Sequence, residues 1–140
     1  MCRRIVAEAG DAIIFADRVN VIRLWNRAAE RVFGFKKEEA LGQSLNLIIP
    51  ERLRERHWEA YRRVMDTGIT KYGEGELLAV PGQRRNGEPL SLEFSLALIR
   101  DDEGRILGSA AILRDVTARW NKEKEMKARL TDLEKKSQRT

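Results

Sequence analysis

The chain of 140 residues is long enough to bury one hydrophobic core and leaves little room for a second domain. Hydrophobic residues make up 42% of it and charged residues 35%, a composition that excludes wholesale disorder. The net charge of +5 comes from 27 basic and 22 acidic residues that are interspersed along the chain. Because no basic stripe studded with aromatic residues results, we expect no nucleic-acid partner.

The first elements predicted are a hairpin and two short helices. Residues 12–16 and 21–25 read as short strands joined by the turn-prone DRVN. The segment NRAAERVFGF follows with apolar residues at helical spacing, where Asn26 is placed to cap the helix and Gly34 to end it. A second short helix in KKEEALGQ ends at Gly42, and SLNLIIP is an apolar connector closed by Pro50.

The longest helix of the globular part is predicted from Glu51 to about Thr67. Its apolar face follows a period of 3.6 residues and comprises Leu53, His57, Ala60 or Tyr61, and Val64. The only histidine of the chain, His57, is therefore predicted to point toward the core. Most of the arginines around it fall on the other faces, where water can solvate them.

After Gly68 the pattern changes to strands. TKYGEGELLAV is predicted as a strand whose glycines permit a bulge, PGQRRNGEP as a turn, and LSLEFSLALI as a long half-buried strand. RDDEGR is the next hairpin loop, and ILGSAAILRDV is a final strand rich in small and β-branched residues. Two strands, three helices and three more strands predict an α+β fold, with one antiparallel sheet and helices on one face.

From Thr117 onward the composition is dominated by Lys, Glu, Arg, Ala and Leu, without glycine or proline, which predicts a helix. A heptad seam along this helix has seven positions, which are Val116, Arg119, Glu123, Met126, Leu130, Leu133 and Ser137. Four of the seven residues are apolar. Trp120 lies next to this seam. We expect a weak coiled coil, and the alternative is an unpaired terminal helix cut from a longer chain.

Cysteine usage and hydropathy limit the cellular setting. Cys2 is the only cysteine, so no internal disulfide and no zinc site built from several cysteines is available. Apolar runs such as AIIFA and LIIP are far shorter than the ~20 residues of a membrane span, and MCRRIVAEAG lacks the apolar region of a secretory signal. We therefore expect no membrane span in this chain and a cytoplasmic location.

Four phrases in this order resemble a PAS domain: DAIIFADRVNVIRLWNRAAERVFGFKKEEALGQ, LIIPE, RRNGEPLSLEFSLALIRDDEGRILG and AILRDVTARW. The resemblance implies a PAS fold over residues 11–116, with a five-stranded antiparallel sheet and flanking helices that enclose an apolar pocket. Residues 1–10 are then an N-terminal flanking segment, and residues 117–140 a helical linker that carries output. PAS domains are sensory and dimerisation modules, and many are fused to histidine kinases, cyclic-dinucleotide enzymes or chemoreceptors. The implied partners are a second copy, through the PAS domain and the C-terminal helix, and a fused or separate effector such as a histidine kinase.

Within this family, ERLRERHWEAYRRVMDTG resembles the corresponding helix of haem-binding PAS domains, namely rhizobial oxygen sensor kinases and direct oxygen sensor phosphodiesterases. In those proteins a histidine shortly after the IPE-type turn ligates the haem iron, and His57 stands at the matching place. A neutral imidazole suits iron, and a helix holds the ring rigidly over an apolar cavity. Candidate pocket walls are Leu45, Ile48, Leu53, Val64, Leu78, Leu92, Phe94, Leu96 and Ile112. Arg63 and Lys71 are candidates to neutralise the propionates of haem b, and the alternative for both is ordinary surface charge.

Other positions depart from the oxygen-sensor pattern or limit the chemistry. Aligned through RRNG, Leu78 stands where the rhizobial sensors carry a distal arginine, and the distal methionine of the phosphodiesterase sensors falls near Glu76. Neither residue supplies the same contact, so the resemblance does not carry over that means of oxygen discrimination. The central-helix cysteine of the flavin photosensors is missing, which excludes a flavin–cysteine adduct. Without a nucleophile elbow, a phosphate loop, or a histidine paired with a reactive serine or cysteine, we expect no enzymatic activity.

Two polar residues mark junctions of the expected fold. Asp115 in RDVT lies where the last strand leads into the terminal helix, at the place that couples a PAS core to its effector. Its carboxylate can cap the helix and hold an arginine. Asn26 resembles the PAS asparagine whose amide ties the following helix to the sheet.

The resulting hypothesis is a sensory and dimerisation domain that binds haem b on His57 and signals through the helix after Thr117. Two alternatives remain open. The domain is either an interaction module without a ligand, in which His57 is a hydrogen-bonded core residue, or a sensor of a small apolar or aromatic metabolite.

Overall fold

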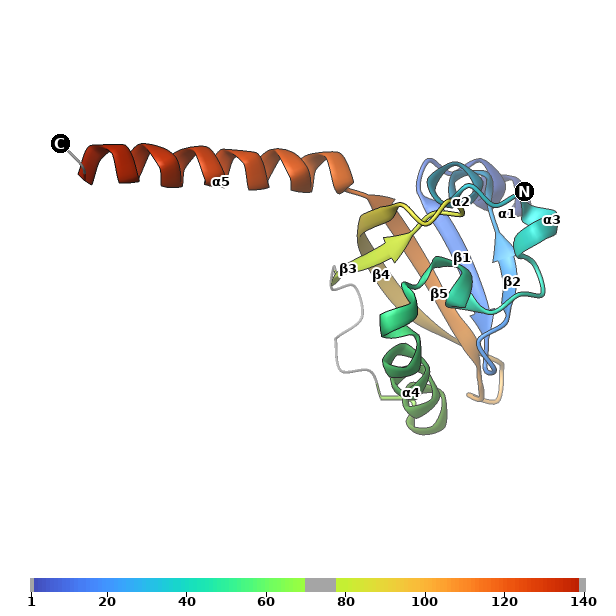
Figure 1. The fold of residues 1–140 in the computed structure, drawn as a ribbon. Helices are drawn as coiled ribbons and strands as arrows, with labels where there is room; N and C mark the ends of the chain where they lie inside the picture. The colour runs from blue at the N-terminus through green and yellow to red at the C-terminus, as the bar shows by residue number, and fades with distance from the viewer. Residues whose placement is uncertain (1, 70–77, 139–140) are drawn as a thin grey trace.

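The computed structural model describes residues 2–69 and 78–138, which form one sheet, a set of helices against it and a long terminal helix (Figure 1). In chain order the elements are α1 (Cys2–Glu8), β1 (Ala12–Asp17), β2 (Ile22–Trp25), α2 (Arg27–Phe33), α3 (Lys37–Ala40), the 3-10 turn η1 (Leu45–Ile48), α4 (Glu51–Thr67), β3 (Leu78–Gln83), β4 (Pro89–Arg100), β5 (Ile106–Asp115) and α5 (Thr117–Gln138). The predicted strand order along the chain is confirmed. The connector SLNLIIP is partly helical, because Ser44 caps η1 by accepting a hydrogen bond from the Asn46 amide.

The five strands form one antiparallel sheet in the order β2-β1-β5-β4-β3. The predicted turn PGQRRNGEP begins too early, because Pro81 and Gly82 belong to β3 and pair with Ser91 and Leu90. Proline is tolerated there because β3 is an edge strand, where its missing amide breaks no ladder between central strands. The turn itself is tighter, with the Arg84 amide bonded to the carbonyl of Glu88.

The core lies between the sheet and the short helices. One cluster of buried side chains joins the inner face of the strands to α2, α3 and η1, and its largest fully buried member is Phe33, packed 5.5 Å from Trp25 between ring centroids. A smaller cluster joins α4 to the other end of the sheet through Ala16, Tyr61, Met65 and Ile106. Leu45 packs against both clusters, so the helices cover one face of the sheet as predicted.

Asn26 ties three elements together. Its Oδ1 accepts hydrogen bonds from the amides of Ala29 and Ile13, at 3.0 and 2.9 Å. Its Nδ2 donates to the carbonyls of Val6 and Asp11, at 2.8 and 3.0 Å. The predicted link between α2 and the sheet is confirmed, and the amide also holds α1, a helix that the sequence reading left as an unassigned flanking segment.

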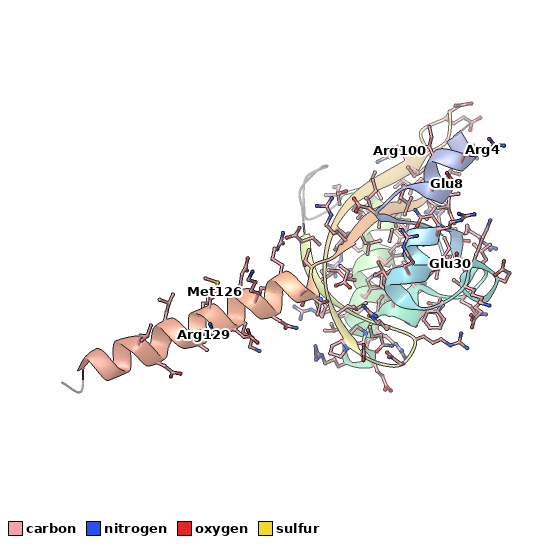
Figure 2. All side chains as sticks on the ribbon, turned by 90° about the horizontal axis from the view of Figure 1, so that it is seen from above. Arg4, Glu8, Glu30, Arg100, Met126 and Arg129 are labelled. Atoms are coloured by element: carbon pink, nitrogen blue, oxygen red, sulfur yellow. The ribbon has the colours of Figure 1, made fainter. Side chains whose placement is uncertain are left out.

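The terminal helix α5 leaves the sheet at the end of β5 and projects away from the globular part (Figures 1 and 2). Met126, labelled in Figure 2, is 56% exposed, and Leu130 and Leu133 are similarly exposed. The predicted helix is confirmed as far as Gln138. No helix in the described part of the chain is long and apolar enough to cross a membrane.

Candidate functional site

The candidate site lies between α4 and the inner face of the sheet. α4 begins after Pro50 and ends at Gly68, whose left-handed backbone (φ 70°) lets its amide bond to the Val64 carbonyl. The buried residues of the helix are Tyr61 and Met65, with Val64 packed beside them. The sequence left either Ala60 or Tyr61 on the inner face of α4. Tyr61 is the buried one of the two and Ala60 is exposed, so the inner face runs through Tyr61.

His57 stands one turn before Tyr61 on the same face of α4 and is half-buried. Its Nδ1 atom is buried and has no hydrogen-bond partner in the part of the chain that the structure describes. The ring lies 5.8 Å from that of Tyr61 between centroids. Burial lowers the pKa of the imidazole, so the neutral form, which can ligate a metal, prevails at pH 7.

Tyr61 attaches α4 to the centre of the sheet. Its hydroxyl donates toward the carbonyls of Asp17 and Ala16, at 2.6 and 3.0 Å, and accepts a hydrogen bond from Ser109 Oγ at 3.3 Å. Burial raises the pKa of this phenol, which keeps the hydroxyl protonated and able to donate. The sequence left either Ala60 or Tyr61 on the core face and did not reveal this bond, and it did not point to Ser109 or Met65.

Strand β4 faces α4 with a row of alternating apolar side chains. Leu90 and Leu92 are buried, whereas Phe94, Leu96 and Leu98 on the same face are only half-buried. Phe94 packs against the larger core cluster and Leu98 against the smaller one, while Leu96 lies between them in the strand. The middle of β4 therefore presents apolar surface that the core does not fully cover.

The other pocket walls proposed from the sequence fall into separate groups. Ile48 and Leu92 are buried in the larger cluster, and Leu45, Leu53 and Val64 are half-buried. Ile112 was assigned wrongly, because it is 48% exposed and lies on the outer face of the sheet. Neighbouring strand residues face opposite sides, and Leu113, which is buried, occupies the inner position.

The positions compared with the oxygen sensors are only partly described. Leu78 is the first residue of β3, and its Cα pairs with that of Phe94, so the strand position lies beside the row that faces α4. Lys71 and Glu76 lie outside the described residues. Arg63 is exposed and lines a shallow, open hollow of about 410 Å³ on the solvent side of α4, together with Glu59, Arg62, Asp66 and Thr67.

The junction between β5 and α5 is held by Asp115, as predicted. Its Oδ1 accepts from the Thr117 amide at 2.9 Å and from the Thr117 hydroxyl at 2.5 Å, and its Oδ2 lies 3.3 Å from Arg84. Burial of the carboxylate acts to raise its pKa, but the bonds from Thr117 and Arg84 outweigh it and hold the pKa below the usual value. The Ser91 amide donates to the Thr117 hydroxyl at 2.9 Å, so β4 is joined to the same junction.

Comparison with known protein families matches residues 6–121 to the PAS fold. Among curated proteins, the chain is 36% identical over 97 residues to the sensor protein FixL of Bradyrhizobium diazoefficiens, covering 67% of this chain and 18% of FixL. It is 28% identical over 96 residues to the oxygen sensor protein DosP of Escherichia coli, covering 69% of this chain and 12% of DosP. It is also 26% identical over 125 residues to the signal transduction histidine-protein kinase AtoS of E. coli, covering 87% of this chain and 19% of AtoS. The chain thus spans less than a fifth of the length of each of these relatives.

The architecture also matches solved structures. The PAS domain of a protein from Colwellia psychrerythraea superposes with a TM-score of 0.71 at 20% identity, covering 84% of this chain and 95% of that one. Three findings agree on the PAS fold: the family match over most of the chain, the sheet order β2-β1-β5-β4-β3, and the helices on one face of the sheet. The chain belongs to the PAS family of sensory domains found in signal-transduction proteins.

Proposed function

We propose that this PAS domain is a gas sensor that binds haem b, and that His57 would hold the iron. The observation that carries the proposal is the buried Nδ1 of His57, which has no hydrogen-bond partner among residues 2–69 and 78–138, although buried polar atoms usually have one. An imidazole packed as a core residue would have its nitrogens satisfied by neighbouring groups. A ring kept neutral and partly unsatisfied, on a helix that faces a sheet, is suited to hold a metal ion.

Half-buried apolar side chains on the inner face of the sheet support an apolar cofactor as the ligand. Phe94 and Leu96 face the helices and are only half-buried, so apolar surface is available on the side of the sheet that α4 covers. Arg63, exposed on the solvent side of α4, and Lys71 are proposed from the sequence to neutralise the propionates, as basic groups do for carboxylates. When bound, haem would supply an iron atom able to take up a diatomic gas, and His57 would hold that iron. The name of the relative DosP, an oxygen sensor protein, supports a gas as the signal.

In this proposal, discrimination between gases differs from that in the oxygen sensors with a distal arginine. Leu78 occupies the aligned position and has no hydrogen-bond donor in its side chain. A bound gas then relies on the iron and on apolar contacts, so carbon monoxide is expected to compete well with oxygen.

We further propose that two copies pair and that the signal passes through α5 to an effector such as a histidine kinase, in the cytoplasm. Exposed apolar side chains support pairing: Ile112 and Ile99 lie on the outer face of the sheet at 48% and 38% exposure, and Met126, Leu130 and Leu133 form one stripe on α5. The ligand must bind one arrangement of α5 more tightly than another, because a ligand without that preference shifts nothing. The domain itself is proposed to have no enzymatic activity, which would belong to the effector.

A hemin titration of the purified full chain tests the haem proposal. The wild type is expected to give a sharp Soret band that saturates at one hemin per chain. His57→Ala is expected to remove or shift the band, and Arg56→Ala, an exposed neighbour on α4, should leave it unchanged. A featureless spectrum at stoichiometric hemin, or a Soret band that is identical in His57→Ala, would contradict the assignment.

The half-buried row on β4 also favours a second candidate, an apolar or aromatic metabolite bound between α4 and the sheet. This ligand would contact Phe94 and Leu96 and would not need the imidazole. Mass spectrometry of small molecules released from the purified protein separates the candidates, because a metabolite is expected to remain bound to His57→Ala. An interaction module with no ligand would release nothing from either protein.

A further inference from the structure

The hydroxyl of Tyr61 forms a buried polar contact between α4 and two strands. Tyr61 is 8% exposed and its partner Ser109 is 4% exposed, so these groups exchange hydrogen bonds with little access to water. The hydroxyl contacts the carbonyls of Ala16 and Asp17 at the end of β1 and the side chain of Ser109 on β5. Ala16 and Ser109 are also paired across the sheet, so the contact is made at one point of the ladder between β1 and β5.

In the described part of the chain, the side-chain hydrogen bonds from α4 to the strands all come from Tyr61. Two other described side chains of α4 donate hydrogen bonds. Arg54 donates to the carbonyl of Ile49, which follows η1, and Thr67 donates to the carbonyl of Arg63 within α4. Tyr61 is the only described side chain of α4 that hydrogen-bonds to a strand. One further directed link reaches the backbone of α4, because Arg18, next to β1, donates hydrogen bonds to the carbonyls of Met65 on α4 and Ile106 on β5, at 3.2 and 2.9 Å. The rest of the attachment is apolar packing through Met65 and Val64, which resists rotation of the helix less than directed bonds do.

The position of Tyr61 relative to His57 gives this contact a consequence for the site. Residues four apart lie one above the other on a helix, and the two rings are 5.8 Å apart between centroids. A small rotation of α4 about its axis would carry the imidazole out of its buried position. The hydroxyl bonds oppose that rotation.

We propose that Tyr61 is a positioning residue, which locks the rotation of α4 on the sheet, keeps His57 facing the core, and links the state of α4 to β5. β5 ends at Asp115, which holds the start of α5, so the same strand joins this contact to the output helix. The part of the proposal that concerns haem rests on the proposed function. The part that concerns the orientation of His57 does not.

The test compares Tyr61→Phe, which removes only the hydroxyl, with Met65→Leu, which disturbs the apolar packing of the same helix face. The first readout needs no haem. Because His57 is the only histidine, its ring resonance in a proton NMR titration is unambiguous, and burial is the cause of its lowered pKa. Tyr61→Phe is expected to move the titration midpoint of His57 up toward that of a solvated histidine, and Met65→Leu to leave it unchanged.

The second readout is hemin affinity. Loss of a group that orients a metal ligand typically weakens metal binding about 10–100-fold, so we expect at least about ten-fold weaker hemin binding by Tyr61→Phe and wild-type binding by Met65→Leu. An unchanged midpoint in Tyr61→Phe, or the same shift in both variants, would overturn the proposal. If the wild type binds no hemin, the haem assignment fails while the titration still decides the role of Tyr61.

A second variant covers the case in which Tyr61→Phe does not fold. Ser109→Ala removes the bond from β5 and retains the bonds to the carbonyls of β1. It is expected to shift the His57 midpoint in the same direction by less. No shift in a folded Ser109→Ala would contradict the link to β5.

Discussion

Replacing Asp115 with alanine is expected to weaken the attachment of α5 and to lower the stability of the whole domain. The substitution removes the acceptor for the Thr117 amide and hydroxyl, and it removes the partner of Arg84. A hydrogen-bonding side chain at a helix start contributes about 1 kcal/mol. The ion pair adds at most about 1 kcal/mol, because its side chains are 40% and 25% exposed. The expected loss is therefore about 1–2 kcal/mol, or about 3–7 °C in Tm for a chain of this size.

Urea denaturation at pH 7 followed by far-UV circular dichroism measures this loss, and two variants serve as controls. Asp115→Asn retains an oxygen for the Thr117 amide and loses the charge, so it should keep roughly half of the contribution. Asp132→Ala removes an exposed carboxylate from α5 and should change stability by less than about 0.5 kcal/mol. If Asp115→Ala unfolds at the same urea concentration as the wild type, Asp115 does not stabilise the junction between β5 and α5. Equal losses in Asp115→Ala and Asp115→Asn would show that charge, and not capping, holds the junction.

Three further predictions concern the histidine, the core and pairing. His57 has a lowered pKa in the folded state, so the unfolded state binds more protons below pH 6.5, and the free energy of unfolding should fall as the pH drops from 6.5 to the folded-state pKa. Urea titrations at several pH values should show that His57→Gln lacks this part of the pH dependence, and identical profiles would contradict it. Phe33→Ala empties a fully buried site against Trp25 and should cost about 3–5 kcal/mol in the same assay, whereas a loss below about 1 kcal/mol would mean that the described core is wrong. Sedimentation analysis should find a dimer for the full chain and a weaker or absent dimer for residues 1–116, and a monomer in both would contradict pairing.

Much of the fold could be predicted because its local signals agree with one another. Asn26 and Gly34 mark the ends of α2 by their capping chemistry, and both lie where the sequence places them. The alternation of residues in LSLEFSLALI correctly indicated which side chains of β4 face the core. Such features depend on residues near in sequence, so the chain itself displays them.

The errors arise where a residue's role depends on distant partners. β5 is apolar on both faces, so periodicity alone did not show that Ile112 points outward and Leu113 inward. Pro81 marked a turn by composition, but the edge position of β3 allows it in a strand. Tyr61 resembled an ordinary core residue, because its partners on β1 and β5 are more than 40 residues away in sequence. The one signal available for it was a single serine, Ser109, within the otherwise uncharged and apolar run from Ile106 to Leu113 of β5.

In the candidate site, too, features set by nearby residues could be predicted, whereas features set by distant partners could not. The facing of His57 followed from helical periodicity, whereas its unsatisfied Nδ1 required the surrounding structure. The position of Arg63 in the sequence does not distinguish a residue that neutralises a propionate from an ordinary surface arginine, because both are exposed.

The most direct test of the central claim is the absorption spectrum of the full chain as isolated from cells supplied with a haem precursor. We expect a Soret band in the purified protein, a shift of that band under carbon monoxide after reduction, and its loss in His57→Ala. A colourless wild-type protein, or a band that His57→Ala retains unchanged, would contradict it.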